Sequence, residues 1–249
     1  MLVSIITPTY NSEKFLQDTF ECIKNQTHHQ WEWIVTDDCS SDDSYRLLEQ
    51  FAKEDSRVRI SRNNVNSGAS VTRNKSISRA NGSYIAFLDS DDLWDKNKLK
   101  TQLEFMKLND ISFCFTSYEV INEEGEKLGK IIDSRPLNFV TYHDMLRKKA
   151  TLGCSTVMLK NNGCDKIIMP DLRTGQDYAL WLKLLRNGNK AFHLNEILTL
   201  YRITSNSISR NKFKKAIRQW EIYREIEKLP LFSALVNFYF YAYRAVFRR

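Results

Sequence analysis

The stretch Ala86-Phe-Leu-Asp-Ser-Asp-Asp-Leu-Trp94 carries most of the information in this sequence. An apolar run that begins at Tyr84 leads directly into three carboxylates, Asp89, Asp91 and Asp92. A buried strand with such an end concentrates negative charge, which is costly to desolvate unless a cation shares it. Mg²⁺ and Mn²⁺ favour carboxylate oxygens, and Mg²⁺ commonly adds substrate phosphates as ligands. The stretch therefore predicts a strand end that holds a metal-bridged diphosphate; the alternative is a loop whose aspartates cap the next helix.

The composition indicates a globular protein. The 249 residues are 42% hydrophobic and 27% charged, which suits one large α/β domain with a tail or two small domains. The five cysteines include no close C-x-x-C pair, which argues against a disulfide framework and a structural zinc site. The N-terminus lacks the basic and long apolar regions of a signal peptide, so we expect a reducing, cytosolic setting.

The net charge of +7 is unevenly distributed. Residues 206–249 contain ten Lys or Arg against three Glu, a local charge of +7, so residues 1–205 carry 27 charges of each sign and are neutral. By charge alone, such a tail suits an anionic phospholipid surface and a nucleic acid equally well.

Strand and helix patterns alternate through the first half of the chain, which predicts an α/β fold with a mostly parallel sheet covered on both faces. We expect strands at residues 2–7, 31–35, 58–60, 84–88 and 111–118. Helices are expected from Ser12, capped by its side chain, from Ser41, and at residues 68–80 and 96–108.

The alternation ends after residue 119. A hairpin is expected between residues 118–121 and 127–132, then a strand at 152–159, a helix at 177–185 and a strand at 197–203. A polar segment at residues 204–209 separates this globular part from the basic tail.

Three expected strands end in polar clusters: Pro8-Thr-Tyr-Asn11, Asp37-Asp38 and Asp89-Ser-Asp-Asp92. Ligands of open α/β sheets bind beyond the carboxyl ends of the strands, so we expect these clusters to share one site. Tyr10 offers a ring on which a nucleobase can stack, and Asp38 can accept hydrogen bonds from a base or ribose. The alternatives are ordinary half-buried packing for the tyrosine and a helix cap for the aspartate.

Arg73 lies in Gly68-Ala-Ser-Val-Thr-Arg-Asn74, at the start of the helix expected at residues 68–80. Its guanidinium can bind phosphate or carbonyl edges in a bidentate way. A surface salt bridge is the alternative.

In this order, the segments resemble the family 2 glycosyltransferases, which have the nucleotide-diphospho-sugar transferase (GT-A) fold. The matching stretches are residues 4–11, 34–42, 68–74, 80–92 and, further along the chain, 175–183. The resemblance implies a GT-A domain at residues 1–205, with a nucleotide-sugar-binding half at 1–118 and an acceptor-side half at 119–205. Residues 206–249 would form a basic, aromatic, amphipathic helical tail.

The resemblance also implies roles for individual residues. Pro8, Tyr10 and Asp38 would hold the nucleoside, Arg73 the base or diphosphate, Asp89 the ribose, Asp91 a Mn²⁺ or Mg²⁺ ion, and Asp177 would be the catalytic base. Inverting transfer does need a carboxylate near the acceptor hydroxyl, and a metal would neutralise the departing diphosphate. The alternative for Asp177 is an acidic residue that complements a helix dipole.

Two positions depart from the family pattern. Gln176 stands where many relatives have Glu, and no His lies near Thr204. Arg202 is a further candidate to contact the diphosphate.

Residues 229–247 are strongly apolar and aromatic, and their nineteen positions approach the length of a membrane span. Pro230, Asn237 and Arg244 interrupt this stretch, and basic residues flank it. The pattern favours a helix that lies on an anionic membrane surface. The alternative is a helix that packs on the domain or pairs two copies in a homodimer.

We therefore expect an inverting hexosyltransferase that uses a nucleotide-diphospho-sugar, by family habit a UDP-sugar. The expected acceptor is an oligosaccharide or lipid-linked saccharide, polyprenyl-diphosphate-linked, in surface polysaccharide assembly such as O-antigen or capsule. The enzyme would lie peripherally at the cytoplasmic face of the cell membrane.

Two other classes are less well supported. A nucleotidyltransferase would carry a Gly/Arg/Lys-rich loop after the first strand, where this chain has Pro8-Thr-Tyr-Asn11. Nucleic acid is not expected as a partner because the carboxylate-bearing strand ends would repel its phosphates. A degenerate, non-catalytic nucleotide-sugar-binding protein remains an alternative.

Overall fold

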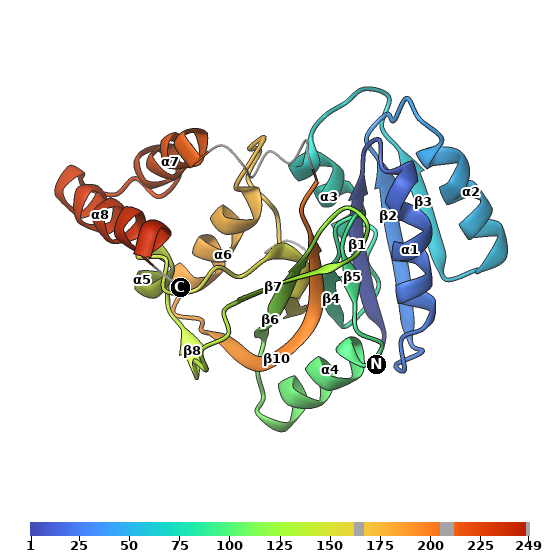
Figure 1. Ribbon diagram of the computed structural model, residues 1–249, viewed down its shortest axis with the longest axis horizontal. Helices are drawn as coiled ribbons and strands as arrows, with labels where there is room; N and C mark the ends of the chain where they lie inside the picture. Colours follow the sequence, from blue (N-terminus) through green and yellow to red (C-terminus); the bar gives the residue numbers. More distant parts are fainter. Residues whose placement is uncertain (162–166, 205–211, 248–249) are drawn as a thin grey trace.

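The computed structural model describes residues 1–161, 167–204 and 212–247 and is built around one ten-stranded sheet (Figure 1). The strand order is β3-β2-β1-β4-β9-β6-β10-β5, with β7 paired to β6 and β8 paired to β10. The strands are β1 Val3–Thr9, β2 Trp31–Asp37, β3 Val58–Arg62, β4 Tyr84–Phe87, β5 Leu93–Trp94, β6 Phe113–Ile121, β7 Lys127–Ile132, β8 Phe139–Val140, β9 Met158–Lys160 and β10 Ala191–Arg202. The helices are α1 Glu13–Lys24, α2 Ser44–Glu54, α3 Ala69–Ile77, α4 Lys98–Leu108, α5 Tyr142–Leu146, α6 Gln176–Arg186, α7 Lys212–Glu221 and α8 Leu231–Phe247.

Six strands point in the same direction. Strands β3, β2, β1 and β4 pair in parallel. Strand β9 is antiparallel to both β4 and β6, so β6 runs in the direction of β4, and β10 is parallel to β6. The expected α/β fold with a mostly parallel sheet is confirmed, and the carboxyl ends of β1, β2 and β4 lie next to one another.

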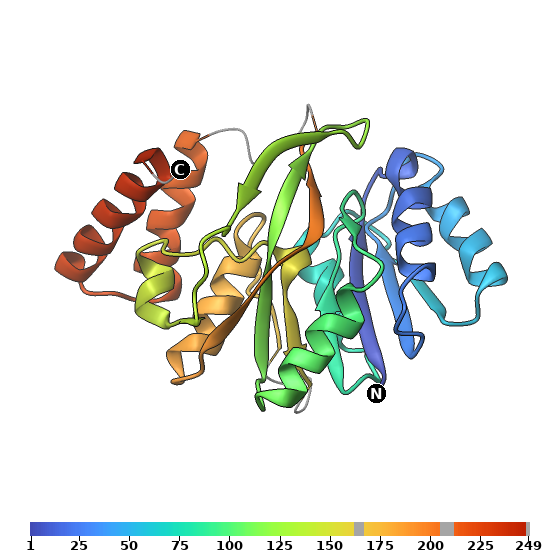
Figure 2. The ribbon, with the colours of Figure 1, turned by 60° about the horizontal axis from the view of Figure 1, so that its bottom comes forward.

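The sheet is covered on both faces, as the continuous apolar strands predicted. Alternate residues of β1 face opposite sides: Ile5 packs in a cluster with helices α1, α2 and α4, whereas Ile6 packs in a cluster with α3, α5 and α6. The predicted hairpin is also confirmed. It consists of β6 and β7 and extends past the sheet at the top of Figure 2.

Three local expectations were wrong. The Ser12 hydroxyl does not cap α1 but bonds the Tyr10 carbonyl oxygen and the Ser90 hydroxyl. Helix α2 begins at Ser44, not at residue 41, because Asp37 binds the backbone N–H of Ser40 and holds the preceding segment as a loop. Of the strand expected at 152–159, β9 retains only the end, because residues 154–156 form a 3₁₀ turn.

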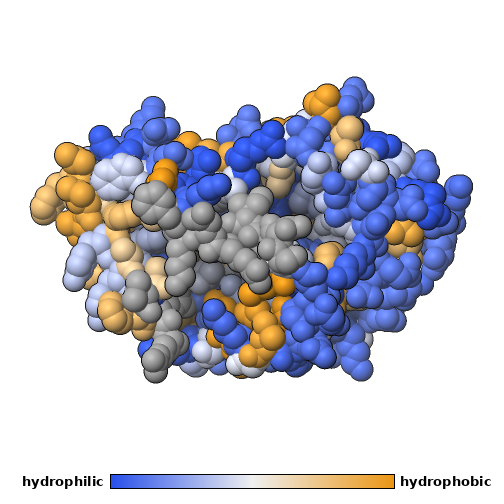
Figure 3. All heavy atoms as spheres, turned by 45° about the horizontal axis from the view of Figure 1, so that its top comes forward, coloured by the Kyte–Doolittle hydropathy of each residue, from blue (hydrophilic) through white to orange (hydrophobic). Residues whose placement is uncertain are grey.

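The C-terminal tail is helical, as expected. Its inner face packs on the domain: Tyr223 is fully buried and donates a hydrogen bond to the Leu146 carbonyl oxygen. Its outer face is apolar and exposed, and Figure 3 shows hydrophobic side chains gathered over α8 at the left end of the molecule. The exposed side chains of α8 include Leu231, Phe232, Leu235, Tyr239, Tyr243 and Phe247.

Within the described part of the chain, no helix combines the length and the apolar character that crossing a membrane would require. The polar segment at residues 204–209 and the two C-terminal arginines fall almost entirely outside the described residues.

Candidate active site

The ends of β1, β2 and β4 border a cleft of about 810 Å³. Six residues singled out in the sequence line it together: Pro8, Tyr10, Asp38, Arg73, Asp89 and Asp91. They come from segments up to 83 residues apart and meet because parallel strands present their carboxyl ends at one edge of the sheet. The ring of Tyr10 is 50% exposed, so its face is accessible to a ligand.

Asp38, directly after β2, is held by donated hydrogen bonds. Its carboxylate accepts from the Asn63 amide at 2.8 Å and from the backbone N–H groups of Ser67 and Gly68 at 2.8 and 2.7 Å. Burial alone would raise the pKa of Asp38, but these hydrogen bonds outweigh burial and lower it. The ionised carboxylate therefore fixes the loop at residues 63–68, which forms one wall of the cleft.

Arg73 of α3 carries a buried guanidinium, with the residue only 4% exposed. Its Nη2 donates to the Asp89 carboxylate, while Nε and Nη1 have no hydrogen-bond partner within the described segments. Burial opposes the charge of Arg73, but the carboxylates of Asp89 and Asp177 outweigh it and raise the pKa. Arg73 thus brings a permanent positive charge to the wall of the cleft, which suits an anionic ligand.

Asp91 and Asp92 follow β4 in different environments. Asp92 is 1% exposed and accepts hydrogen bonds from the Ser155 hydroxyl at 2.5 Å and the Arg202 N–H at 2.9 Å. Burial, with the nearby charge of Asp89, raises the pKa of Asp91 to about 6. A bound cation would relieve this energetic penalty.

The donor set fits a divalent metal that shares its ligands with a substrate. Asp89 and Asp91 offer carboxylate oxygens at the cleft. Over residues 1–161, 167–204 and 212–247, no cluster of three His, Cys, Asp or Glu side chains could hold a metal by itself. A diphosphate would therefore supply the remaining oxygens, as Mg²⁺ sites commonly require.

Arg202, expected to contact a diphosphate, instead positions the segment that contains Asp91. It is 3% exposed, and its Nε and Nη1 donate to the carbonyl oxygens of Asp91 and Glu123 at 2.8 and 2.6 Å. These contacts join the end of β10, the turn of the β6–β7 hairpin and the carboxylate cluster. In this structure Nε and Nη1 bind protein carbonyls, and a contact between Arg202 and the diphosphate stays a prediction.

Asp177 lies in the first turn of α6, which is anchored by the fully buried Ala179, Leu180 and Leu182. Burial raises the pKa of Asp177, although the charge of Arg73 opposes the shift. The mutual effect of these charges shows that the carboxyl lies near the Arg73–Asp89 pair. Asp177 is not among the described residues that line the cleft, so its link to the cleft is its electrostatic effect on Arg73.

Contacts between the two halves of the domain were missed. Arg173 lines the cleft and donates to the Asn66 side chain at 3.0 Å, and Asn74 of α3 exchanges two hydrogen bonds of 2.9 Å with the backbone of Met169. These partners are about 100 residues apart in sequence. No local pattern marks them.

Parallel strand ends with an exposed aromatic ring, a carboxylate pair and a buried arginine form a cleft of the kind that suits a nucleotide sugar. Comparison with known proteins agrees, because residues 4–167 match the model of glycosyl transferase family 2. The chain belongs to this family, so the resemblance is confirmed and the protein is a glycosyltransferase.

Two curated relatives cover almost the entire chain. TuaG of Bacillus subtilis, a putative teichuronic acid biosynthesis glycosyltransferase, is 45% identical over 248 residues, covering 100% of this chain and 97% of the relative. WfgD of Escherichia coli, a UDP-Glc:alpha-D-GlcNAc-diphosphoundecaprenol beta-1,3-glucosyltransferase, is 38% identical over 231 residues, covering 92% of this chain and 88% of the relative.

Solved structures share the fold. S. aureus TarS (1-349) in complex with UDP-GlcNAc has a TM-score of 0.74 at 22% identity, covering 90% of this chain and 65% of that one. The mannosyltransferase PcManGT from Pyrobaculum calidifontis, in complex with GDP-Man and Mn²⁺, has a TM-score of 0.64 at 15% identity, covering 88% of this chain and 61% of that one.

Proposed function

We propose that this protein transfers a hexose, with inversion, from a UDP-sugar to a polyprenyl-diphosphate-linked saccharide in surface polysaccharide assembly. The main support is the cleft in which Arg73, Asp89 and Asp91 meet at the strand ends, with the charge of Asp177 acting on Arg73. The relatives TuaG and WfgD, named for teichuronic acid biosynthesis and for glucosyl transfer to a diphosphoundecaprenol-linked sugar, support the donor and acceptor classes.

In this proposal the strand ends bind the donor. Pro8, Tyr10 and Asp38 hold the nucleoside, with the base stacked on the exposed ring of Tyr10. Asp89 accepts a hydrogen bond from the ribose through the carboxylate oxygen that Arg73 leaves free. The positive charge of Arg73 at the wall of the cleft stabilises the diphosphate.

Asp91 and the diphosphate oxygens would hold Mg²⁺ or Mn²⁺. Bound there, the ion supplies a Lewis acid that neutralises charge on the departing diphosphate. The raised pKa of Asp91 supports this role, because burial beside Asp89 leaves the carboxylate without enough nearby positive charge.

Asp177 acts as the general base. The acceptor hydroxyl oxygen forms a bond to the anomeric carbon while the bond from that carbon to the diphosphate oxygen breaks. The hydroxyl proton passes to the Asp177 carboxylate, and the nucleoside diphosphate leaves with the electron pair of the broken bond. Burial raises the pKa of Asp177 towards the working pH, which favours proton acceptance in the transition state.

The tail would keep the enzyme at the cytoplasmic face of the membrane. Helix α8 presents an exposed apolar stripe that includes Phe232, Tyr239 and Phe247, and the domain does not cover this stripe. Lys214, Lys215 and Arg224 supply positive charge on the neighbouring tail segments. An apolar face flanked by cations suits the surface of an anionic bilayer; a second copy of the chain is the competing occupant.

The test is transfer from a panel of UDP-sugars to N-acetylglucosaminyl diphosphate farnesol, with Mg²⁺, Mn²⁺ or a chelator. We expect metal-dependent turnover of one donor that Asp177→Asn abolishes. Asp110→Asn is the matched control, because Asp110 is 99% exposed and its φ of 49° is readily adopted by Asn. If the unaltered protein transfers sugar from none of the donors, the proposal is wrong. If transfer proceeds in the presence of the chelator, the enzyme does not need a metal ion.

A further inference from the structure

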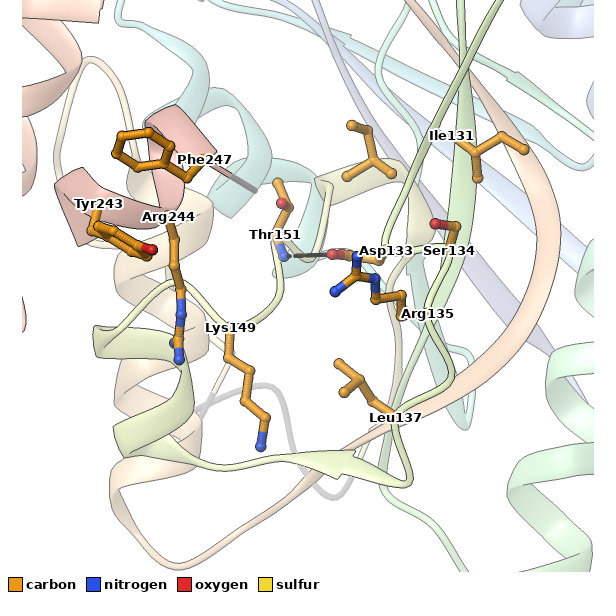
Figure 4. A pocket seen from close by; sticks show the side chains of 11 residues that line it. Ile131, Asp133, Ser134, Arg135, Leu137, Lys149, Thr151, Tyr243, Arg244 and Phe247 are labelled. Carbon is orange, nitrogen blue, oxygen red and sulfur yellow. Dashed lines mark hydrogen bonds between the residues drawn. The ribbon is translucent and has the colours of Figure 1, made fainter. Parts of the chain in front are cut away.

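A second cavity, of about 410 Å³, lies between the segment after β7 and the C-terminal end of α8 (Figure 4). We call it the β7–α8 groove. Three cationic side chains line it, Arg135, Lys149 and Arg244, together with apolar side chains that include Ile131, Leu137 and Phe247. Figure 4 shows Arg135 extending from the β7 side towards the middle of the groove, with Lys149 and Arg244 on the opposite side.

The groove has an excess of positive charge. Its one acidic residue among the described lining is Asp133, whose carboxylate accepts from the backbone N–H groups of Thr151 at 2.9 Å and Leu152 at 3.2 Å. Lys149 pairs with Asp144 at 3.2 Å, whereas Arg135 has no hydrogen-bond or ion-pair partner in the described part of the chain. A free guanidinium in a hollow suits a phosphate group.

Strand β7 links this groove to the neighbourhood of Asp177. Ile131 of β7 lines the groove, and the preceding Lys130 lies near Lys215 of α7. Burial lowers the pKa of Lys215, the charge of Lys130 adds to this shift, and the charge of Asp177 opposes it. Cationic side chains are therefore found on α7 (Lys215) and β7 (Lys130) as well as in the groove at the end of α8.

The groove combines the two chemistries of a prenyl diphosphate. Its cations suit a diphosphate, and the side chains of Leu137 and Phe247 suit an aliphatic chain. The exposed stripe of α8 continues from Phe247 towards the surface that would face the lipid. A ligand with its saccharide at Asp177 and its lipid chain in a bilayer would have to pass between these points.

We propose that the β7–α8 groove binds the diphosphate and the first isoprene units of the lipid-linked acceptor, with Arg135 as the main phosphate contact. This assignment rests on the proposed function, because it takes its ligand from the acceptor class named there. It adds a specificity site that is separate from the donor cleft.

The test compares Arg135→Gln with Arg135→Lys and with Lys53→Gln, which removes an exposed charge from the distant helix α2. Two acceptors are used with the same donor: N-acetylglucosaminyl diphosphate farnesol and an octyl N-acetylglucosaminide without phosphate. We expect Arg135→Gln to raise KM for the diphosphate acceptor about tenfold, the loss typical of one charged hydrogen bond. The KM for the donor and kcat/KM for the octyl glycoside should stay unchanged, and Arg135→Lys should retain most of the affinity.

A binding measurement separates this inference from the proposed function. Farnesyl diphosphate is titrated by calorimetry into each variant, with UDP and Mg²⁺ saturating the donor cleft. Weaker binding to Arg135→Gln supports the groove even if no sugar is transferred; equal binding to all variants overturns it even if transfer proceeds.

Two further probes identify the ligand. If inorganic diphosphate binds as tightly as farnesyl diphosphate, the apolar wall is not used and the lipid assignment is wrong. If Arg135→Gln weakens binding to phosphatidylglycerol vesicles as much as binding to farnesyl diphosphate, the groove recognises membrane charge and not the acceptor.

Discussion

Two strand ends in the same cleft use the same residue type in opposite ways. Asp38, after β2, receives hydrogen bonds from Asn63, Ser67 and Gly68 that lower its pKa. Asp91, after β4, is buried beside Asp89, and its pKa is raised to about 6. The first carboxylate is kept ionised by protein donors at the wall where the nucleoside would bind, whereas the second has an electrostatic deficit that an external cation can fill. Sequence position alone does not separate these roles.

The largest expected effect comes from Asp91→Asn. We expect turnover to fall about 10³-fold, since a metal contributes several kcal/mol of charge stabilisation in the transition state. Stability should not fall: the pKa of Asp91 is higher in the folded chain, so its ionisation destabilises the fold as pH rises from about 4 to about 6. Asn removes this effect, and melting curves at pH 4 and pH 7 should show a gain only at the higher pH.

Asp110→Asn provides the control for charge removal at an exposed position. Full metal-dependent turnover by Asp91→Asn would contradict the assignment of this strand end to a cation.

The next largest effect is expected for Asp177→Asn. This variant tests whether the chemical step needs a carboxyl outside the two strand ends, which would then serve donor binding alone. We expect kcat to fall about 10²- to 10⁴-fold, the usual contribution of a general base, with unchanged affinity for the donor. Because burial raises the pKa of Asp177, the rate of the unaltered enzyme should rise with pH above the ordinary range of an aspartate. Stopped-flow rates across pH 4 to 8 with donor titrations check both points, and a matching loss of donor affinity would argue for a structural role.

A smaller effect is expected for Asp38→Asn, and it falls on stability. In the variant, the NH₂ group of the new side-chain amide at position 38 would face a donor such as the Gly68 N–H. Two donors then oppose each other and one hydrogen bond is lost, which lowers the free energy of unfolding by about 1–3 kcal/mol. The pKa of Asp38 is lower in the folded chain, so the stabilisation is present at neutral pH and is lost as pH falls through the acid range below about 4. Urea titrations at pH 7 and pH 3.5 should show that the difference in unfolding free energy between the unaltered protein and Asp38→Asn shrinks in acid. Equal stabilities at pH 7 would show that the Asp38 carboxylate is not stabilised by its hydrogen bonds.

The smallest expected effect is that of Gly68→Ala. Gly68 has a φ of +87°, which an L-residue adopts only with strain, so we expect a loss of about 1–2 kcal/mol; the added Cβ would make ordinary contact, at 3.4 Å, with the side chain of Arg173. Gly188→Ala is the matched control, since Gly188 has a φ of +86° and open space around it. Only Gly68→Ala should also raise the KM for the donor, by shifting the N–H that holds Asp38; equal KM values would show that this loop does not shape the donor site.

Much of the fold was predictable because its signals are local. The strands before Asp38 and Asp89 are continuous apolar runs, and their polar ends identify one edge of the sheet. The start of α2 was misplaced because Asp37 binds Ser40. The strand expected at 152–159 was too long because residues 154–156 form a 3₁₀ turn, and Asp133 binds the N–H groups of Thr151 and Leu152 just before it. In each case a side chain competed with regular backbone pairing.

By itself, the sequence determined the α/β class, the strand ends and the residue types gathered there, since burial patterns and turn chemistry act over a few residues. The tertiary structure decided what each charged group does. Arg202 binds the carbonyl oxygen of Asp91 across 111 positions, and Arg135 and Arg244 border one groove from separate segments. The pKa of a carboxyl depends on burial and on neighbours that arrive from distant parts of the chain, so identical aspartates acquire different roles only after folding.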